Sequence, residues 1–260
     1  MPSPIWTPAA LFSEAKPRRG RCWRIVEAQH RIATLKLVDD LDEQSLLEDL
    51  LERSKPSVPP ACRHLHWLLF TPFRYGAPYP KGSRFRRQGL TPGVFYASEK
   101  VETAVAEIAF HRLLFYADSP ATPWPADAAE YTAYAALFRT RRAIDLSAPP
   151  FAEDRPVWID PLDYTSTQAL ADAARSAGIA VIRYESARDP LGGYNFALLT
   201  CRTYAARKPL ANLAHAPQPV RRSRDLRVPR SALELRPPDV LPRSPDCRLA
   251  MAAMIAIMMP

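Results

Sequence analysis

Glycine is scarce in this sequence, and its scarcity excludes several common sites. The 260 residues include 8 Gly but 28 Pro, against average usages of about 7% and 5%. Neither G-x-G-x-x-G nor G-x-x-x-x-G-K-[ST] occurs, which excludes the standard dinucleotide fingerprint and the Walker phosphate loop. G-x-S-x-G and H-E-x-x-H are also missing, so a serine-hydrolase elbow and a zinc-binding helix of those types are excluded.

Metal-binding spacings, export signals and long apolar runs are lacking too. The four cysteines form no C-x-x-C pair, so no metal site is expected. The first residues lack a basic stretch followed by an apolar core, unlike a secretory signal. The longest apolar run, Leu249 to Pro260, has twelve residues, whereas a membrane span needs about 20. We therefore expect a cytoplasmic chain with reduced thiols and no membrane contact.

The composition that is present is that of a folded protein with a basic surplus. Apolar residues make up 47% and charged residues 24%, and the formal net charge is +8. Half of that surplus lies in the tail from Leu210 to Pro260, which holds eight Arg and four acidic residues. Such charge favours anionic partners, but no nucleic-acid recognition motif accompanies it.

The pattern of elements predicts an α+β domain between two extensions. Strands are expected at 23–26, 94–97, 131–139, 142–146, 179–184 and 195–200. Helices are expected after Asp40, ending at Lys55-Pro56; after the N-cap Ser98, to about 116; and from a Thr165/Gln168 capping box to Gly178. We assign 1–54 to an extension whose amphipathic helix packs on the domain, 55–207 to the domain, and 208–260 to a disordered basic Pro/Arg-rich tail.

One segment combines arginine, glycine and aromatic residues. Arg74, Arg84, Arg86 and Arg87 lie within fourteen residues that also contain Gly76 and Gly82, with Tyr75 inside the segment and Tyr96 shortly after it. Arginine forks bind phosphate and carboxylate oxygens in pairs, and flat rings stack on a base. The segment is either a loop for a nucleotide-like ligand or a solvated basic loop.

Glu107 is an isolated carboxylate in the apolar helix sequence V-A-E-I-A-F. A buried ionised carboxylate is costly unless it is paired, and Arg74 or Arg84 is the expected partner. Glu107 is therefore either half of a structural ion pair or a functional acid in a cleft.

The third candidate segment, Y-E-S-A-R-D-P-L-G-G-Y-N-F, places Ser186, Arg188 and Asn195 at expected strand ends. Neither His nor Lys lies close to Ser186 in sequence, so we expect this hydroxyl to orient another group by hydrogen bonding. His111, one helical turn after Glu107, leaves a Ser/His/acid triad open.

Together these segments resemble the RES-domain family, named for its recurring Arg, Glu and Ser. The resemblance runs in order from about Lys55 to Tyr204, through SKPSVPP, LLFTPFRYG, GSRFR, PGVFYAS, ETAVAEIAFHR, DPLDYTSTQAL and YESAR…GGYNF. It implies an ADP-ribosyltransferase-like fold with mixed sheets and flanking helices. It also implies the toxin of a type II toxin–antitoxin pair, which cleaves the nicotinamide–ribose bond of NAD with water or phosphate as acceptor.

The resemblance also assigns residues and partners. Arg74, Glu107 and Ser186 would be catalytic, and Tyr75, Arg84 and Tyr96 would bind NAD, which is a substrate rather than a resident cofactor. From their places at strand ends, we add Arg188 and Asn195 to the expected NAD-binding residues. The implied partner is a helix-turn-helix-type antitoxin, through which any contact with nucleic acid would pass, and a homodimer is allowed. Two alternatives stay open: a protein mono-ADP-ribosyltransferase using the same site, and a non-catalytic binding protein.

Overall fold

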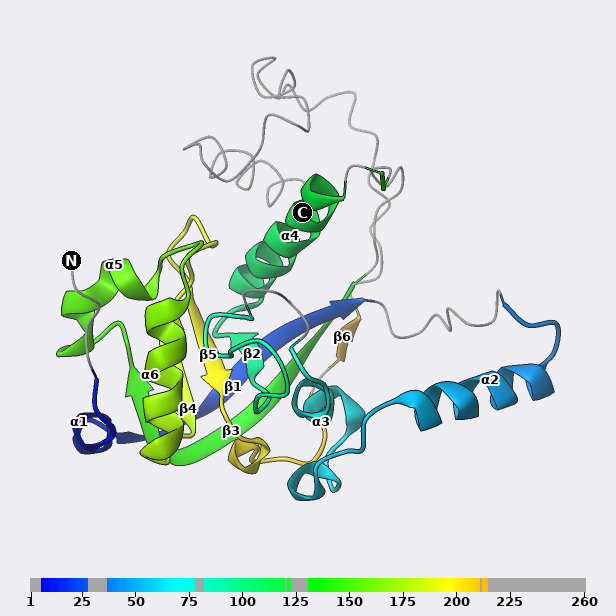
Figure 1. Cartoon of the computed structure of the whole chain (residues 1–260), viewed down its shortest axis with the longest axis horizontal. Coiled ribbons are helices and arrows are strands. Elements are labelled where there is room, and N and C mark those ends of the chain that lie inside the picture. The colour runs from blue at the N-terminus through cyan, green and yellow to red at the C-terminus, as the bar shows by residue number, and fades with distance from the viewer. Residues whose placement is uncertain are drawn as a thin grey trace, which may run out of the picture.

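A computed structural model of the chain describes residues 6–27, 37–77, 82–119, 121–122, 131–210 and 212–214. Helices and strands alternate along these residues (Figure 1). The strands are β1 (Lys16–Glu27), β2 (Phe95–Ser98), β3 (Tyr131–Asp145), β4 (Val181–Glu185), β5 (Tyr194–Leu198) and β6 (Asn212–Ala214). The helices are α1 (Pro8–Ser13), α2 (Leu41–Ser54), α3 (Trp67–Arg74), α4 (Val101–Asp118), α5 (Arg155–Trp158) and α6 (Thr165–Ser176), with short 3-10 turns at Pro60–Cys62, Phe151–Asp154 and Cys201–Thr203.

The sheet closes on itself. Its strand order is β1-β2-β5-β4-β3-β6, and β1 also pairs with β3, so five strands form a closed barrel with β6 added beside β3. The β3–β4 pair is parallel, whereas the other pairs are antiparallel. The expected α+β class is confirmed, but one closed sheet takes the place of the expected mixed sheets. The ADP-ribosyltransferase-like character of the fold stays a prediction.

Two hydrophobic clusters lie on opposite faces of the strands. Because alternate strand residues point to opposite faces, Ile182 joins one cluster and its neighbour Val181 the other. The first cluster includes the buried Trp158 and Phe85, and Figure 1 shows α1, α5 and α6 on that side. The second cluster packs Leu69 of α3 onto the sheet. Because both faces of the strands are buried, the strands are held firmly in place. The polar candidate residues at the strand ends are held in place with them.

Two strands are longer than the sequence predicts. β3 runs without a break through the two strands expected at 131–139 and 142–146, and β1 extends well before the expected 23–26. These strands pair with each other from Lys16↔Ala143 to Glu27↔Tyr131. The residues added to β1 are mostly polar, such as Arg19 and Arg21, and so are Thr140 and Arg141, which join the two expected parts of β3. A search for apolar alternation therefore does not detect them.

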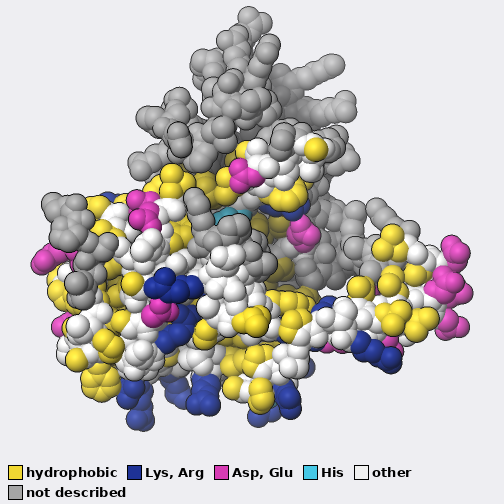
Figure 2. All heavy atoms as spheres, in the orientation of Figure 1, with side chains coloured by type: hydrophobic (Ala, Val, Ile, Leu, Met, Phe, Trp, Pro, Cys, Tyr) yellow, Lys and Arg dark blue, Asp and Glu magenta, His cyan; other side chains and the backbone are white. Residues whose placement is uncertain are grey.

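Helix α2 has the predicted ends but not the predicted packing. Asp40 caps it by accepting hydrogen bonds from the backbone N–H groups of Asp42 and Glu43, and the helix stops before Lys55. It nevertheless extends away from the barrel (Figure 1), with hydrophobic side chains on its surface (Figure 2). Leu41 and Leu46 are 77% and 60% exposed. The expectation that this helix packs on the domain is wrong, because its leucines meet no sheet face.

The expectation of reduced thiols is wrong for two cysteines. Cys62 and Cys201 form a disulfide between two 3-10 turns, across a sequence separation of 139 residues. Cys22 is free and buried, and burial raises the pKa of its thiol to about 12. Cys22 is therefore a packing residue and not a reactive thiolate.

We expect the disulfide to contribute measurably to stability. Replacing Cys62 and Cys201 together by serine should lower the free energy of unfolding by about 2–4 kcal/mol, because the crosslink restricts a long loop in the unfolded chain. Urea unfolding of the oxidised protein and of the variant tests this expectation. Reductant should destabilise the wild type alone, and equal midpoints for oxidised wild type and variant would contradict the prediction.

The expected tail begins with a strand. Asn212 to Ala214 pair antiparallel with Tyr134 to Thr132 of β3. The expectation of disorder from 208 onward is therefore wrong at β6, and the part of the tail from 215 lies outside the described residues. Within the residues that are described, no helix has the length and apolar character needed to cross a membrane.

Candidate active site

Glu107 lies on α4 and receives hydrogen bonds from the sheet. Its Oε1 atom accepts from Ser186 Oγ and from Asn195 Nδ2, each at 2.6 Å. Its Oε2 atom lies 3.7 Å from Nη1 of Arg188. The expected partners Arg74 and Arg84 are thus replaced by Arg188. The carboxylate is 22% exposed, so it is fixed in direction but still accessible.

The hydroxyl group of Ser186 makes all the hydrogen bonds it can within the site. It donates to Glu107 and accepts from the backbone N–H groups of Arg188 (3.2 Å) and Asp189 (3.0 Å). Since a hydroxyl has one proton and two lone pairs, both lone pairs are taken by backbone N–H groups and none is left for nucleophilic attack. The serine–histidine pairing that His111 left open does not form in the described part of the chain. Ser186 orients Glu107, as the sequence analysis expected.

A second hydroxyl supports the same carboxylate from further away. Ser98 Oγ donates to Asn195 Oδ1 at 2.6 Å, and both residues are 2% exposed. This bond turns the Asn195 amide so that its nitrogen faces Glu107. Ser98 was expected to cap α4, but the cap position is Lys100 and Ser98 is the last residue of β2. Because its sequence context is typical of a helix cap, Ser98 was not predicted as a residue of the site.

Two arginines are buried around the carboxylate. Arg84 is 5% and Arg188 8% exposed. Arg84 Nη1 donates to the Trp158 carbonyl oxygen (2.5 Å), while Arg188 lies 4.5 Å from the Phe110 ring centre. Burial and the neighbouring Arg188 lower the pKa of Arg84. Burial alone would lower the pKa of Arg188, but Glu107 and Tyr164 outweigh it and raise that pKa.

Both buried arginines keep unused donors. Arg84 Nη2 and Arg188 Nε are buried and have no hydrogen-bond partner. Two guanidinium groups around one carboxylate leave a net positive charge. Buried donors without partners are costly, so the arrangement favours an anion.

Tyr96 supports this region through its hydroxyl group. The oxygen accepts from the Phe85 backbone N–H and lies 2.9 Å from Ser83 Oγ. These contacts hold the turn that carries Arg84. Burial raises the pKa of Tyr96, so the hydroxyl stays protonated at neutral pH.

Arg74 and Tyr75 lie at a different place from the other candidates. Arg74 ends α3 and forms an ion pair with Glu52 of α2 at 2.8 Å, while its Nε donates to the Pro56 carbonyl. Its guanidinium also lies 5.9 Å from the Tyr75 ring centre. Neither residue contacts Glu107 or Ser186 in the described structure. The helix α3, where the sequence was ambiguous, turns Arg74 toward α2.

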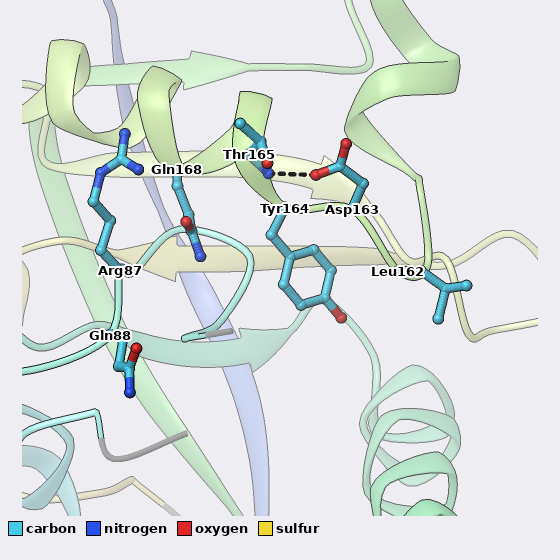
Figure 3. Close-up of a pocket in the computed structure, with 7 residues that line it drawn as sticks. All are labelled: Arg87, Gln88, Leu162, Asp163, Tyr164, Thr165 and Gln168. Atoms are coloured by element: carbon cyan, nitrogen blue, oxygen red, sulfur yellow. Dashed lines mark hydrogen bonds between the residues drawn. The ribbon is translucent and has the colours of Figure 1, made fainter. Parts of the chain in front are cut away.

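A pocket of about 640 Å³ borders the site (Figure 3). Its lining residues are Arg87, Gln88, Leu162, Asp163, Tyr164, Thr165 and Gln168.

The capping box expected at Thr165 and Gln168 is wrong, because the Gln168 side-chain amide donates to the Ser83 and Arg86 carbonyls instead. Tyr164, which the sequence analysis did not select, connects the pocket to the arginines. Among the described residues, no group of three His, Cys, Asp or Glu could hold a metal ion.

A family model of the RES domain matches residues 58–233. The match covers more than half of the chain. The chain belongs to the RES-domain family. The matched RES segment begins near the expected boundary at 55 and runs past the expected end at 207.

Other comparisons add little to the RES assignment. A search of curated proteins found no match. A solved structure similar to this RES protein is the M. tuberculosis MbcT–MbcA toxin–antitoxin complex, with 16% sequence identity and a TM-score of 0.42. The similarity covers 72% of this chain and 80% of that chain.

Two of the three residue types that give the RES domain its name, Glu and Ser, lie together in the structure at motif positions. Glu107 and Ser186 are in direct contact. The arginines near this pair are Arg188 and Arg84 rather than Arg74. Arg188 and Asn195, predicted from strand ends alone, both contact Glu107.

Proposed function

We propose that this RES protein consumes NAD by breaking its nicotinamide–ribose bond, with water or phosphate as acceptor. The observation that carries the proposal is the pair of buried arginines, Arg84 and Arg188, which faces one carboxylate and retains unpartnered N–H donors. The pyrophosphate of NAD supplies anionic oxygens in pairs, which suit guanidinium forks. A neutral ligand would leave the surplus charge uncompensated.

Glu107 is proposed to stabilise the ribose as the bond breaks. The bonding electron pair leaves with the nicotinamide nitrogen, which becomes neutral, and the sugar gains oxocarbenium-like charge, as in glycoside cleavage. A fixed carboxylate stabilises that charge. Water then gives ADP-ribose and a proton, whereas phosphate gives ADP-ribose 1″-phosphate.

Nicotinamide release by the purified protein tests this proposal. NAD should disappear with and without phosphate, and the mass of the second product names the acceptor. In a lysate containing labelled NAD, a labelled protein band would support the alternative of protein mono-ADP-ribosylation. No NAD loss and no labelled band, in wild type and Glu107→Gln alike, would favour the non-catalytic alternative.

The biological role is proposed from the family resemblance. The protein would be the toxin of a toxin–antitoxin pair in the cytoplasm, held inactive by a helix-turn-helix-type antitoxin. Such a toxin should arrest growth when expressed alone. Arrest by the wild type but not by Glu107→Gln would support this role, and equal growth of both strains would contradict it.

Ser186→Ala should lower kcat by about tenfold, with a smaller change in the KM for NAD. The substitution removes a charge-assisted hydrogen bond to Glu107, and such bonds contribute about 1.5–3 kcal/mol. Steady-state nicotinamide release measures the effect. Ser176→Ala, which removes only an exposed hydroxyl contact to Asp172, is the matched control. If both variants kept wild-type kcat, Ser186 would have no orienting role.

A further inference from the structure

Tyr164 contacts both buried arginines at once. Its hydroxyl oxygen accepts a hydrogen bond from Arg188 Nη2 at 2.6 Å. Its ring lies 5.0 Å from the Arg84 guanidinium carbon. One side chain therefore contacts one arginine through an oxygen lone pair and the other through the face of a ring.

The hydroxyl group of Tyr164 has a defined direction. It donates its proton to the Pro161 carbonyl oxygen at 3.2 Å, which leaves a lone pair for Arg188. The residue is also anchored by its backbone, because its carbonyl accepts from the Gln168 N–H in the first turn of α6. Tyr164 is thus held from two sides before it contacts either arginine.

A neutral side chain at this point has a consequence for charge. An aspartate or glutamate between Arg84 and Arg188 would neutralise one of them. Tyrosine fixes the direction of both guanidinium groups through a hydrogen bond and a cation–π contact, yet adds no negative charge to that of Glu107. The surplus therefore remains available to an anionic ligand.

Tyr164 also faces the open pocket. Figure 3 shows its ring among the pocket-lining side chains, between Gln168 and Leu162. The same ring is the face on which Arg84 rests. Arg84 and Arg188 are not among the residues that line this pocket, so Tyr164 is the side chain that connects the pocket to both of them.

We propose that Tyr164 is a positioning residue that sets the relative placement of Arg84 and Arg188 for the two phosphates of a dinucleotide. The inference rests on the proposed function, because it names the part of the same site that adjusts its affinity for pyrophosphate. Tyr164 acts through the arginines and takes no part in bond cleavage. Its loss should therefore weaken binding more than turnover.

The test uses Tyr164→Phe, which removes the hydroxyl and keeps the ring. Calorimetry with ADP-ribose should give a Kd about tenfold higher than for the wild type, as expected when a hydrogen bond to a charged group is lost. The KM for NAD should rise similarly, whereas kcat should change less than about threefold. Tyr164→Leu, which also removes the ring, should raise the Kd further.

Tyr204→Phe is the matched control. It removes a tyrosine hydroxyl that donates to the Leu69 carbonyl at 3.1 Å in the other hydrophobic cluster. Both phenylalanine variants should lose some thermal stability, but Tyr204→Phe should keep the wild-type Kd and KM. Equal Kd values for Tyr164→Phe and wild type would overturn the inference, as would a fall in kcat with KM unchanged.

The two proposals fail in different ways. NAD cleavage would be contradicted if the wild-type protein bound ADP-ribose but neither released nicotinamide nor labelled a protein. In that case a higher Kd for Tyr164→Phe would still support the positioning role. NAD turnover in the wild type with unaltered Tyr164→Phe binding would contradict the positioning role alone. Absence of ADP-ribose binding by the wild type would overturn the inference.

Discussion

Replacing Glu107 by glutamine is expected to lower kcat for NAD cleavage by about a thousandfold, at the upper end of what a single charge-stabilising group contributes. Glutamine keeps the size of the side chain and an oxygen that accepts from Ser186 and Asn195. It removes the negative charge that opposes the developing charge on the ribose. The measurement is nicotinamide release under saturating NAD.

Glu102→Gln is the matched control for that substitution. Glu102 is an exposed residue in the first turn of the same helix, so its loss changes the net charge equally but not the site. This variant should keep wild-type kcat. A Glu107→Gln variant that retains its fold and a tenth or more of the wild-type rate would remove Glu107 from the mechanism.

The second large effect is expected from Arg84→Lys, which should lower kcat/KM for NAD by about a hundredfold. Lysine keeps a positive charge but loses the planar fork, and with it the contact to the Trp158 carbonyl and the stacking on Tyr164. These contacts hold the guanidinium in place for the ligand, and a charge-assisted hydrogen bond to phosphate that is lost with the fork costs about 1.5–3 kcal/mol, which is roughly a hundredfold. Most of the loss should appear in KM, since Arg84 is proposed to bind phosphate.

The control for this variant is Arg155→Lys. Arg155 forms a two-pronged surface pair with Glu185, at 2.6 and 2.5 Å, so the same exchange breaks a similar fork outside the site. Its kcat/KM should stay near wild type. Circular dichroism should show folded protein for both variants. Unchanged kcat/KM in Arg84→Lys would contradict its assignment to the ligand.

Much of the site could be predicted because short stretches of sequence determine it. Ser186, Arg188 and Asn195 flank one tight loop between β4 and β5, and Glu107 stands out as a carboxylate in an apolar helix. Their contacts follow once strand ends and helix are placed together. The placement of Arg74 could not be predicted, because the sequence around it was ambiguous between helix and strand. The last turn of α3 directs its side chain to Glu52 and not to the Glu107 carboxylate.

The missed residues have roles that depend on contacts between distant segments. Ser98 has a sequence context typical of a helix cap, and Tyr164 precedes an apparent capping box. Both act through partners far along the chain, Asn195 and Arg84. The closed sheet was also missed, because the β1–β3 pairing joins two segments more than 100 residues apart, and neither segment alone shows which strand it pairs with.

The way the Glu107 site is assembled also sets when the proposed activity could begin during synthesis. Its carboxylate comes from α4, yet two of the groups that hold it, Ser186 and Asn195, lie 79 and 88 residues later in the chain. A ribosome must therefore translate past Asn195, and β5 must join the barrel, before the carboxylate is oriented. Incomplete chains that end earlier should be catalytically silent, so the newly made protein has a built-in delay during which a partner can bind.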